Sequence, residues 1–135
     1  MEAIARFQGG AKFEISARGH KIISDQPPAN GGADEGMTPP EFLLASLASC
    51  AGFYAAQYLK ARGLPAAGLE VRVTAEKALK PARLAAFRIE VALPELHPAH
   101  EEGLLRAAKA CLIHHTLESA PQIEFAVLTA APISR

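Results

Sequence analysis

The sequence predicts a single α+β domain, because segments with strand-like alternation of apolar and polar residues are interrupted by two longer apolar segments of helical type. The expected order is βββ-α-ββ-α-β, with antiparallel sheets around a buried central helix. A chain of 135 residues buries enough surface to fold around one core without disulfide support. Neither an internal repeat nor a linker-like segment divides the sequence. We therefore expect one domain over residues 1–135.

Three short strands are expected before the first helix. Apolar and polar residues alternate in residues 2–8, 12–16 and 20–24, and a turn at residues 16–19 separates the second segment from the third. This arrangement is typical of an antiparallel meander. Residues 26–37, "QPPANGGADEGM", should form a loop, since two prolines and three glycines favour neither a strand nor a helix.

The first helix has clear start and stop signals. Thr38 is expected as its N-cap, with proline at the first helical position and Glu41 three residues after the cap, which makes a capping box. Gly63 marks its C-terminal end. Residues 42–59 are apolar on nearly every face. We therefore expect this helix to be buried all round, with one face covered by its own sheet and another by a second subunit.

Two strands, a second helix and a last strand are expected after it. Residues 69–75 and 86–93 alternate apolar and polar side chains, so each strand should have one solvent-facing side. Apolar residues at helical spacing predict a helix that starts near Pro98 and continues through His115. Residues 122–129, "QIEFAVLT", alternate again and should form the closing strand.

The composition excludes several classes of function. Fourteen basic and fourteen acidic side chains give a formal net charge of zero, so the chain has no electrostatic footprint for nucleic acid or for an anionic membrane. The N-terminus shows no signal-peptide core, and we expect no segment near the roughly 20 apolar residues that span a bilayer. The expectation is a soluble cytoplasmic protein without nucleic-acid or membrane partners.

The two cysteines, Cys50 and Cys111, lie on the apolar stripes of the two expected helices. Each alone is best interpreted as a small hydrophobe, because free cysteine is among the most frequently buried residue types. In a reducing cytosol a functional pair is more often redox-active or metal-binding than structural. If packing brings the sulfurs together, one thiolate could attack a peroxide O–O bond, and the other could resolve the sulfenic acid as a disulfide.

Such chemistry needs a group that lowers the thiol pKa, because an apolar environment raises it. Glu41 is the carboxylate nearest to Cys50 in the sequence. Nine helical residues nevertheless place it roughly 13 Å along the axis and roughly 180° around the helix from Cys50. Glu41 is therefore either only the far half of the capping box or part of a site that another segment or subunit completes.

Four histidines lie near the second expected helix. His114 and His115 follow Cys111 closely, and His97 and His100 are similarly spaced. Two such ligands do not complete a zinc site, which needs four ligands, or three and a water. We therefore interpret them as polar residues at helix ends and predict no metal site.

Two segments resemble a known family. Residues 25–63, "DQPPANGGADEGMTPPEFLLASLASCAGFYAAQYLKARG", resemble the signature of the OsmC/Ohr superfamily: a Gly-containing loop, a Thr-Pro-x-Glu helix start and a cysteine in the central helix. Residues 110–117, "ACLIHHTL", resemble that family's second cysteine segment. The pattern is closer to the OsmC-like branch than to the dedicated organic hydroperoxide resistance enzymes. Leu112 stands where proline commonly follows the second cysteine, and Phe42 replaces a usual aliphatic residue.

The resemblance implies an intertwined homodimer with two active sites at the subunit interface. It implies that Cys50 is the peroxidatic cysteine, that Cys111 is the resolving cysteine, and that Glu41 and Arg18 organise the thiolate. The implied activity is that of an enzyme, a thiol-dependent peroxidase that reduces organic hydroperoxides in oxidative stress defence. A small dithiol or a lipoyl group would be the reductant. Neither a metal nor an organic cofactor is expected.

The substrate preference and the alternative function both depend on a pocket. An apolar pocket lined from the central helix by residues such as Phe53 and Tyr54 would favour organic hydroperoxides over hydrogen peroxide. The alternative is a non-catalytic binding protein of the same fold, in which the pocket holds a small molecule and the cysteines serve only packing. Peroxide turnover distinguishes the two functions.

Overall fold

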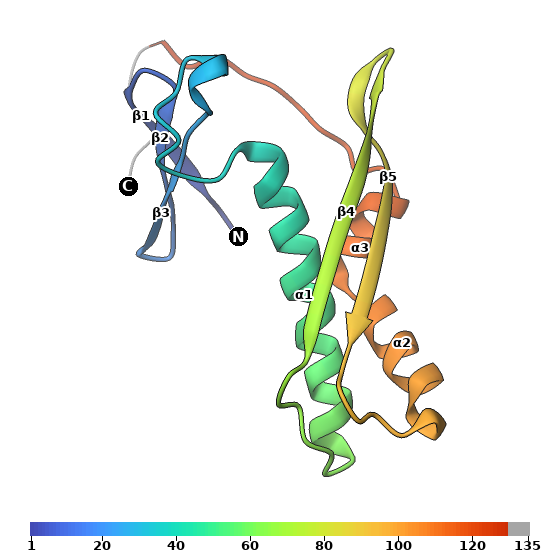
Figure 1. Cartoon of the computed structure of the whole chain (residues 1–135). Helices are drawn as coiled ribbons and strands as arrows, with labels where there is room; N and C mark the ends of the chain where they lie inside the picture. Colours follow the sequence, from blue (N-terminus) through green and yellow to red (C-terminus); the bar gives the residue numbers. More distant parts are fainter. Residues whose placement is uncertain (130–135) are drawn as a thin grey trace.

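The computed structural model describes residues 1–129 and contains two antiparallel sheets and three α-helices (Figure 1). The elements in chain order are β1 (Ile4–Gly9), β2 (Lys12–Ala17), β3 (His20–Ser24), α1 (Pro39–Ala61), β4 (Glu70–Leu79), β5 (Ala82–Ala92), α2 (Glu101–Lys109) and α3 (Leu112–Glu118). Short 3₁₀ turns cover Pro28–Asn30 and Pro98–His100. The N-terminal sheet lies at one end of α1, whereas the β4–β5 hairpin runs along the helix (Figure 1).

The N-terminal sheet confirms the predicted meander. Its strands pair in the order β1-β2-β3, and both pairs are antiparallel. The β2–β3 hairpin closes through Arg18 and Gly19, whose φ angles are 49° and 84°. Two consecutive residues with positive φ form the kind of tight turn that matches the twist of the paired strands.

The start of α1 also agrees with the sequence. The backbone N–H of Thr38 donates to Glu41 Oε2 at 2.7 Å, and the Thr38 hydroxyl donates to the same oxygen at 2.9 Å. These bonds provide an acceptor for the backbone N–H and for the hydroxyl of the N-cap residue at the start of the helix. The helix ends at Ala61, and Gly63 follows with a φ of 66°.

The single chain buries one side of α1. The buried residues recur every fourth position along one face, namely Leu47, Ala51, Ala55 and Leu59. That face packs against β4, α2 and α3, and Leu59 forms a core cluster with Ala55 and Leu104. Phe53, on another face, is 58% exposed. A single chain does not test the expected cover by a second subunit, so burial on every side of the helix stays a prediction.

The expectation about membrane-length segments was wrong as well. By length and composition, α1 could cross a bilayer: it has 23 residues, and its most apolar window has a mean hydropathy of 1.3. The central helix of a folded core passes the same test. The capping contacts of Thr38 and the packing of Leu47 and Leu59 give α1 the features of such a core helix.

In the C-terminal half one hairpin agrees with the prediction, and two elements differ from it. Strands β4 and β5 pair antiparallel, as expected. The single predicted helix is instead two helices, α2 and α3, separated at Ala110 and Cys111. The predicted closing strand over residues 122–129 is wrong for the single chain, because these residues pair with no strand among residues 1–129. The large apolar side chains of residues 122–129 are exposed in the single chain, from 71% for Ile123 to 95% for Phe125.

Candidate active site

The fold brings the two cysteines into contact. Cys50 lies on α1 and is half-buried, whereas Cys111 lies between α2 and α3 and is fully buried. The two side chains lie close enough for hydrogen bonding between them to lower the pKa of Cys50 and to raise that of Cys111. Both cysteines are free thiols. The packing of α2 and α3 against α1 therefore produces the contact that the peroxidase mechanism requires.

The first turn of α3 surrounds both sulfurs with backbone donors. Cys111 is the N-cap residue, in an extended conformation, and its sulfur accepts the N–H of His114 at 3.4 Å. The backbone N–H groups of Leu112 and Ile113 lie close enough to Cys50 for hydrogen bonding from them to lower its pKa. The first N–H groups of a helix have no partner within the helix, so they are available to sulfur acceptors.

These contacts change the pKa values of the two thiols in opposite directions. Burial raises the pKa of Cys50, but hydrogen bonds from Cys111, Ile113 and Leu112 outweigh it, so the pKa falls below that of an ordinary cysteine. Burial and the hydrogen bond to Cys50 raise the pKa of Cys111. Cys50 is thus the more acidic thiol of the pair, and Cys111 is the less acidic one. A more acidic thiol beside a less acidic one is the arrangement that attack and resolution need.

The structure does not bring Glu41 or Arg18 to the thiols of the same chain. Glu41 is exposed and bonded to Thr38, whose backbone N–H and hydroxyl lower the pKa of the Glu41 carboxyl. Arg18 is exposed in the β2–β3 turn. Within residues 1–129, no hydrogen bond or ion pair joins either residue to Cys50 or Cys111.

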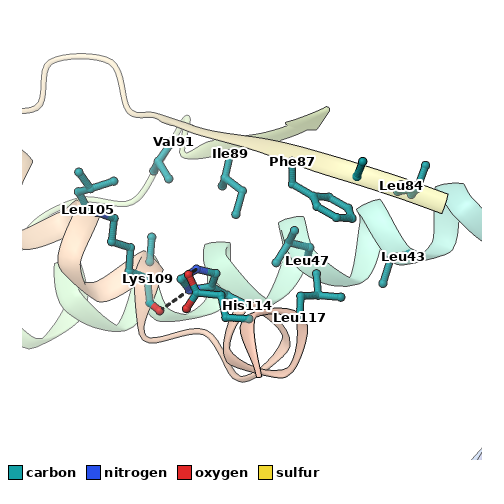
Figure 2. Close-up of a pocket in the computed structure, with 13 residues that line it drawn as sticks. Leu43, Leu47, Leu84, Phe87, Ile89, Val91, Leu105, Lys109, His114 and Leu117 are labelled. Carbon is teal, nitrogen blue, oxygen red and sulfur yellow. Dashed lines mark hydrogen bonds and ion pairs between the residues drawn. The ribbon is translucent and has the colours of Figure 1, made fainter. Parts of the chain in front are cut away.

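An apolar cavity of about 570 Å³ lies between α1, β5, α2 and α3 (Figure 2). Its apolar walls come from α1, β5, α2 and α3, and include Leu43, Leu47, Leu84, Phe87, Ile89, Val91, Leu105 and Leu117. Lys109, His114 and Glu118 add polar groups. Leu47 precedes Cys50 by one helical turn, so the cavity begins next to the thiols although neither sulfur lines it. A cavity of this size and composition can hold an organic group.

Phe53 and Tyr54 do not line this cavity. Their rings pack edge to face, with centroids 5.4 Å apart. The expectation that they form the walls of a pocket beside the thiols is therefore wrong for this cavity. The side chains that do form it lie on the β4–β5-facing side of α1 and on β5, as Figure 2 shows for Leu47 and Phe87.

The histidines are divided between two places. His100 Nδ1 lies 3.3 Å from the Tyr58 hydroxyl, and its ring contacts that of His97 edge to face. His114 and His115 lie on α3. Among residues 1–129, no group of three or more His, Cys, Asp or Glu side chains is arranged to hold a metal ion.

The fold and the thiol site place the chain in a known class of proteins. Residues 31–126 match the family model of the OsmC-like proteins, and the chain belongs to that family. No curated protein matches the sequence.

Several solved structures share the fold. A Psychrobacter arcticus protein assigned to the osmotic stress and detoxification response has a TM-score of 0.77 and 24% identity, over 84% of this chain and 85% of that chain. An organic hydroperoxide resistance protein OsmC from Legionella pneumophila has a TM-score of 0.59 and 18% identity, over 87% and 89%. The organic hydroperoxide resistance protein OhrB of Bacillus subtilis has a TM-score of 0.54 and 21% identity, over 88% and 90%.

Proposed function

We propose that this protein is a thiol-dependent peroxidase that reduces organic hydroperoxides through Cys50 and Cys111. The observation that carries the proposal is the hydrogen-bonded pair in which the pKa of Cys50 is lowered and that of Cys111 is raised. Membership of the OsmC-like family supports it. The names of the Legionella pneumophila and Bacillus subtilis structures, both organic hydroperoxide resistance proteins, support the substrate class.

The reaction has three balanced steps. The Cys50 thiolate attacks the distal oxygen of the hydroperoxide, the O–O bond breaks, and the alkoxide leaves and takes a proton to become an alcohol. The Cys111 sulfur then attacks the sulfenic acid of Cys50, which forms the disulfide and releases water. Finally, a small dithiol or a dihydrolipoyl group reduces the disulfide by exchange and is itself oxidised to a cyclic disulfide. The last step suits a reducing compartment, and we place the protein in the cytoplasm.

The cavity beside the thiols supports an organic substrate. Its walls are apolar, and it begins one helical turn from Cys50. An alkyl or aryl group bound there would leave the hydroperoxide end at the Cys50 sulfur. Burial of that group favours binding by about 25 cal/mol per Å² of apolar surface, a contribution that hydrogen peroxide cannot make.

The test is consumption of cumene hydroperoxide by the purified protein with dihydrolipoamide as reductant, together with mass spectrometry of the protein after peroxide alone. We expect catalytic turnover and a Cys50–Cys111 disulfide, with slower consumption of hydrogen peroxide. If neither a sulfenic acid nor a disulfide forms at Cys50, the proposal is wrong. Occupancy of the cavity by a small molecule in such an inactive protein would instead support the binding function.

We also propose that the functional unit is a homodimer. The single chain leaves several faces of α1 open and its strand-like residues 122–129 unpaired. A second copy of the chain could cover the helix, pair with this segment, and supply Arg18 and Glu41 to the thiols. Its partner strand would satisfy the backbone groups and bury Phe125 and its neighbours.

The dimer predicts a specific effect of substitutions in residues 122–129. Phe125→Lys should convert the dimer into a monomer, because it places a charge among apolar side chains that the partner would bury. Glu124→Lys is the matched control, since it adds a lysine on the other side of the same segment. Analytical ultracentrifugation measures the mass of the wild-type protein and of each variant in solution. A wild-type protein that sediments as a monomer would refute the dimer.

A further inference from the structure

The imidazole of His114 joins the end of α2 to α3. Its Nδ1 lies 2.9 Å from the backbone oxygen of Lys109, the last residue of α2. Its Nε2 lies 3.0 Å from Oε1 of Glu118, one turn further along α3. Figure 2 shows His114 close to Lys109 at the edge of the cavity. The ring therefore spans the break between the helices in which Cys111 lies.

Both partners of this imidazole can only accept hydrogen bonds. A backbone carbonyl has lone pairs and no proton, and an ionised carboxylate likewise accepts only. An imidazole N–H can donate to either partner, and the ring nitrogens lie within hydrogen-bond distance of both. The ring of His114 is thus placed to connect the end of α2 to the last turn of α3.

The connection bears directly on the thiols. The backbone N–H of His114 donates to the Cys111 sulfur, and those of the two residues before it lie close enough to Cys50 to lower its pKa. The direction of all three N–H groups depends on how α3 is set against α2. The C-terminal carbonyls of α2 lack partners within their own helix. The ring of His114 therefore fixes the orientation on which the sulfur contacts depend.

We propose that His114 is a positioning residue, whose imidazole holds α3 against the end of α2 and thereby keeps the N–H groups of its first turn on the two sulfurs. What the thiols then do rests on the proposed function, but the positioning itself does not. The inference assigns one of the four histidines a specific role beyond that of a polar residue at a helix end.

The charged and titratable groups around the ring come from α2 and α3. Glu118 contacts the ring directly, and Lys109 also lines the cavity. The His115 ring lies 5.5 Å from that of His114, centroid to centroid. The cavity residues from α1 and β5 are apolar and include no charged group.

The first measurement is hydrogen exchange of the backbone amides at the start of α3. In the wild-type protein the N–H groups of residues 112–114 should be protected from exchange, because each has an acceptor. In His114→Gln they should exchange faster, and in Glu118→Gln, which keeps an oxygen acceptor, the change should be smaller. Unprotected amides in the wild-type protein would refute the proposal, even if every variant failed to fold.

The second measurement is the alkylation rate of Cys50 by iodoacetamide as a function of pH, followed by mass spectrometry. Because the pKa of Cys50 is lowered, its alkylation should reach half its limiting rate at a lower pH than an ordinary thiol. In His114→Gln we expect this midpoint to rise, with alkylation near neutral pH roughly tenfold slower, the change expected for one lost hydrogen bond to a charged sulfur. Glu118→Gln should shift the midpoint partway.

The matched control is His115→Gln, which makes the same substitution at the adjacent, exposed position of α3. Its midpoint should equal that of the wild-type protein. An unchanged midpoint in folded His114→Gln, or an equal shift in His115→Gln, would overturn the proposal. The outcome is separate from peroxide turnover: a shifted midpoint without turnover would refute the peroxidase function and leave the positioning role of His114 intact.

Discussion

Cys50→Ser should abolish hydroperoxide turnover and reduce peroxide consumption to the rate in buffer. The serine hydroxyl can neither ionise near neutral pH nor form a sulfenic acid, so the first step is lost. Cys111 cannot replace it, because its pKa is raised and its sulfur is fully buried. The loss should span several orders of magnitude, as expected when an enzyme loses its nucleophile. The measurement is steady-state consumption of cumene hydroperoxide with dihydrolipoamide.

Cys111→Ser is the matched control, because the same substitution at the other sulfur separates attack from resolution. The serine hydroxyl can still donate a hydrogen bond to the Cys50 thiolate. A stoichiometric burst of peroxide consumption should therefore remain, with a sulfenic acid trapped at Cys50. Steady turnover should fall unless the external dithiol reduces that acid directly. The opposite pattern, with turnover kept in Cys50→Ser and lost in Cys111→Ser, would exchange the two roles.

Local sequence patterns predicted the elements whose partners lie nearby in the chain. Alternation identified the three N-terminal strands and the β4–β5 hairpin, and Thr38 with Glu41 identified the start of α1. These features depend on hydrogen bonds and side-chain contacts within a few residues. The contact between Cys50 and Cys111 depends instead on how α1, α2 and α3 pack, so the sequence could only present it as one of two alternatives.

Two features depended on long-range contacts and were missed. The residues around Ala110 and Cys111 all permit a helix, and the break there accompanies the contact of Cys111 with Cys50 rather than any proline or glycine. The alternation in residues 122–129 is that of a strand, but a strand also needs an edge to pair with, and these residues pair with none of the strands within residues 1–129. A sequence pattern predicts which side chains of a segment can be buried, but it does not predict which surface buries them.

Asp25 is the residue that the sequence analysis overlooked. It is 1% exposed, and its carboxylate accepts three backbone N–H groups, from Gln26 at 2.8 Å, Ala33 at 3.1 Å and Glu35 at 3.1 Å. Its own N–H donates to the backbone oxygen of Met37 at 3.3 Å. An aspartate at the start of a glycine-rich loop is a signal for such side-chain-to-backbone bonding. The loop between β3 and α1 is thus organised around this one carboxylate.

Asp25→Ala should give the largest loss of stability among single substitutions in that loop, about 2–4 kcal/mol, because it leaves three N–H groups without the acceptor around which the loop is folded. Asp25→Asn should lose less than Asp25→Ala, since its amide oxygen still accepts while its NH₂ group faces a backbone donor. Denaturant unfolding measures both. Asp34→Asn is the matched control, because it removes the same charge from an exposed residue of the same loop and should change the free energy of unfolding by less than about 0.5 kcal/mol.

A substitution at Gly32 tests the same hydrogen bonds of the loop by crowding the Asp25 carboxylate instead of removing it. A Cβ atom there would lie 1.8 Å from the Gln26 backbone oxygen and 2.7 Å from Asp25 Oδ1. Gly32→Ala must therefore displace either the backbone or the carboxylate, and its stability loss should not add to that of Asp25→Ala, because both act on one set of hydrogen bonds. Fully additive losses in the double variant would show that the loop is not held by Asp25. Non-additive losses would show that the Asp25 carboxylate holds the loop. The backbone N–H of the same residue donates to Met37, which precedes the Thr38 cap from which α1 carries Cys50 into the site.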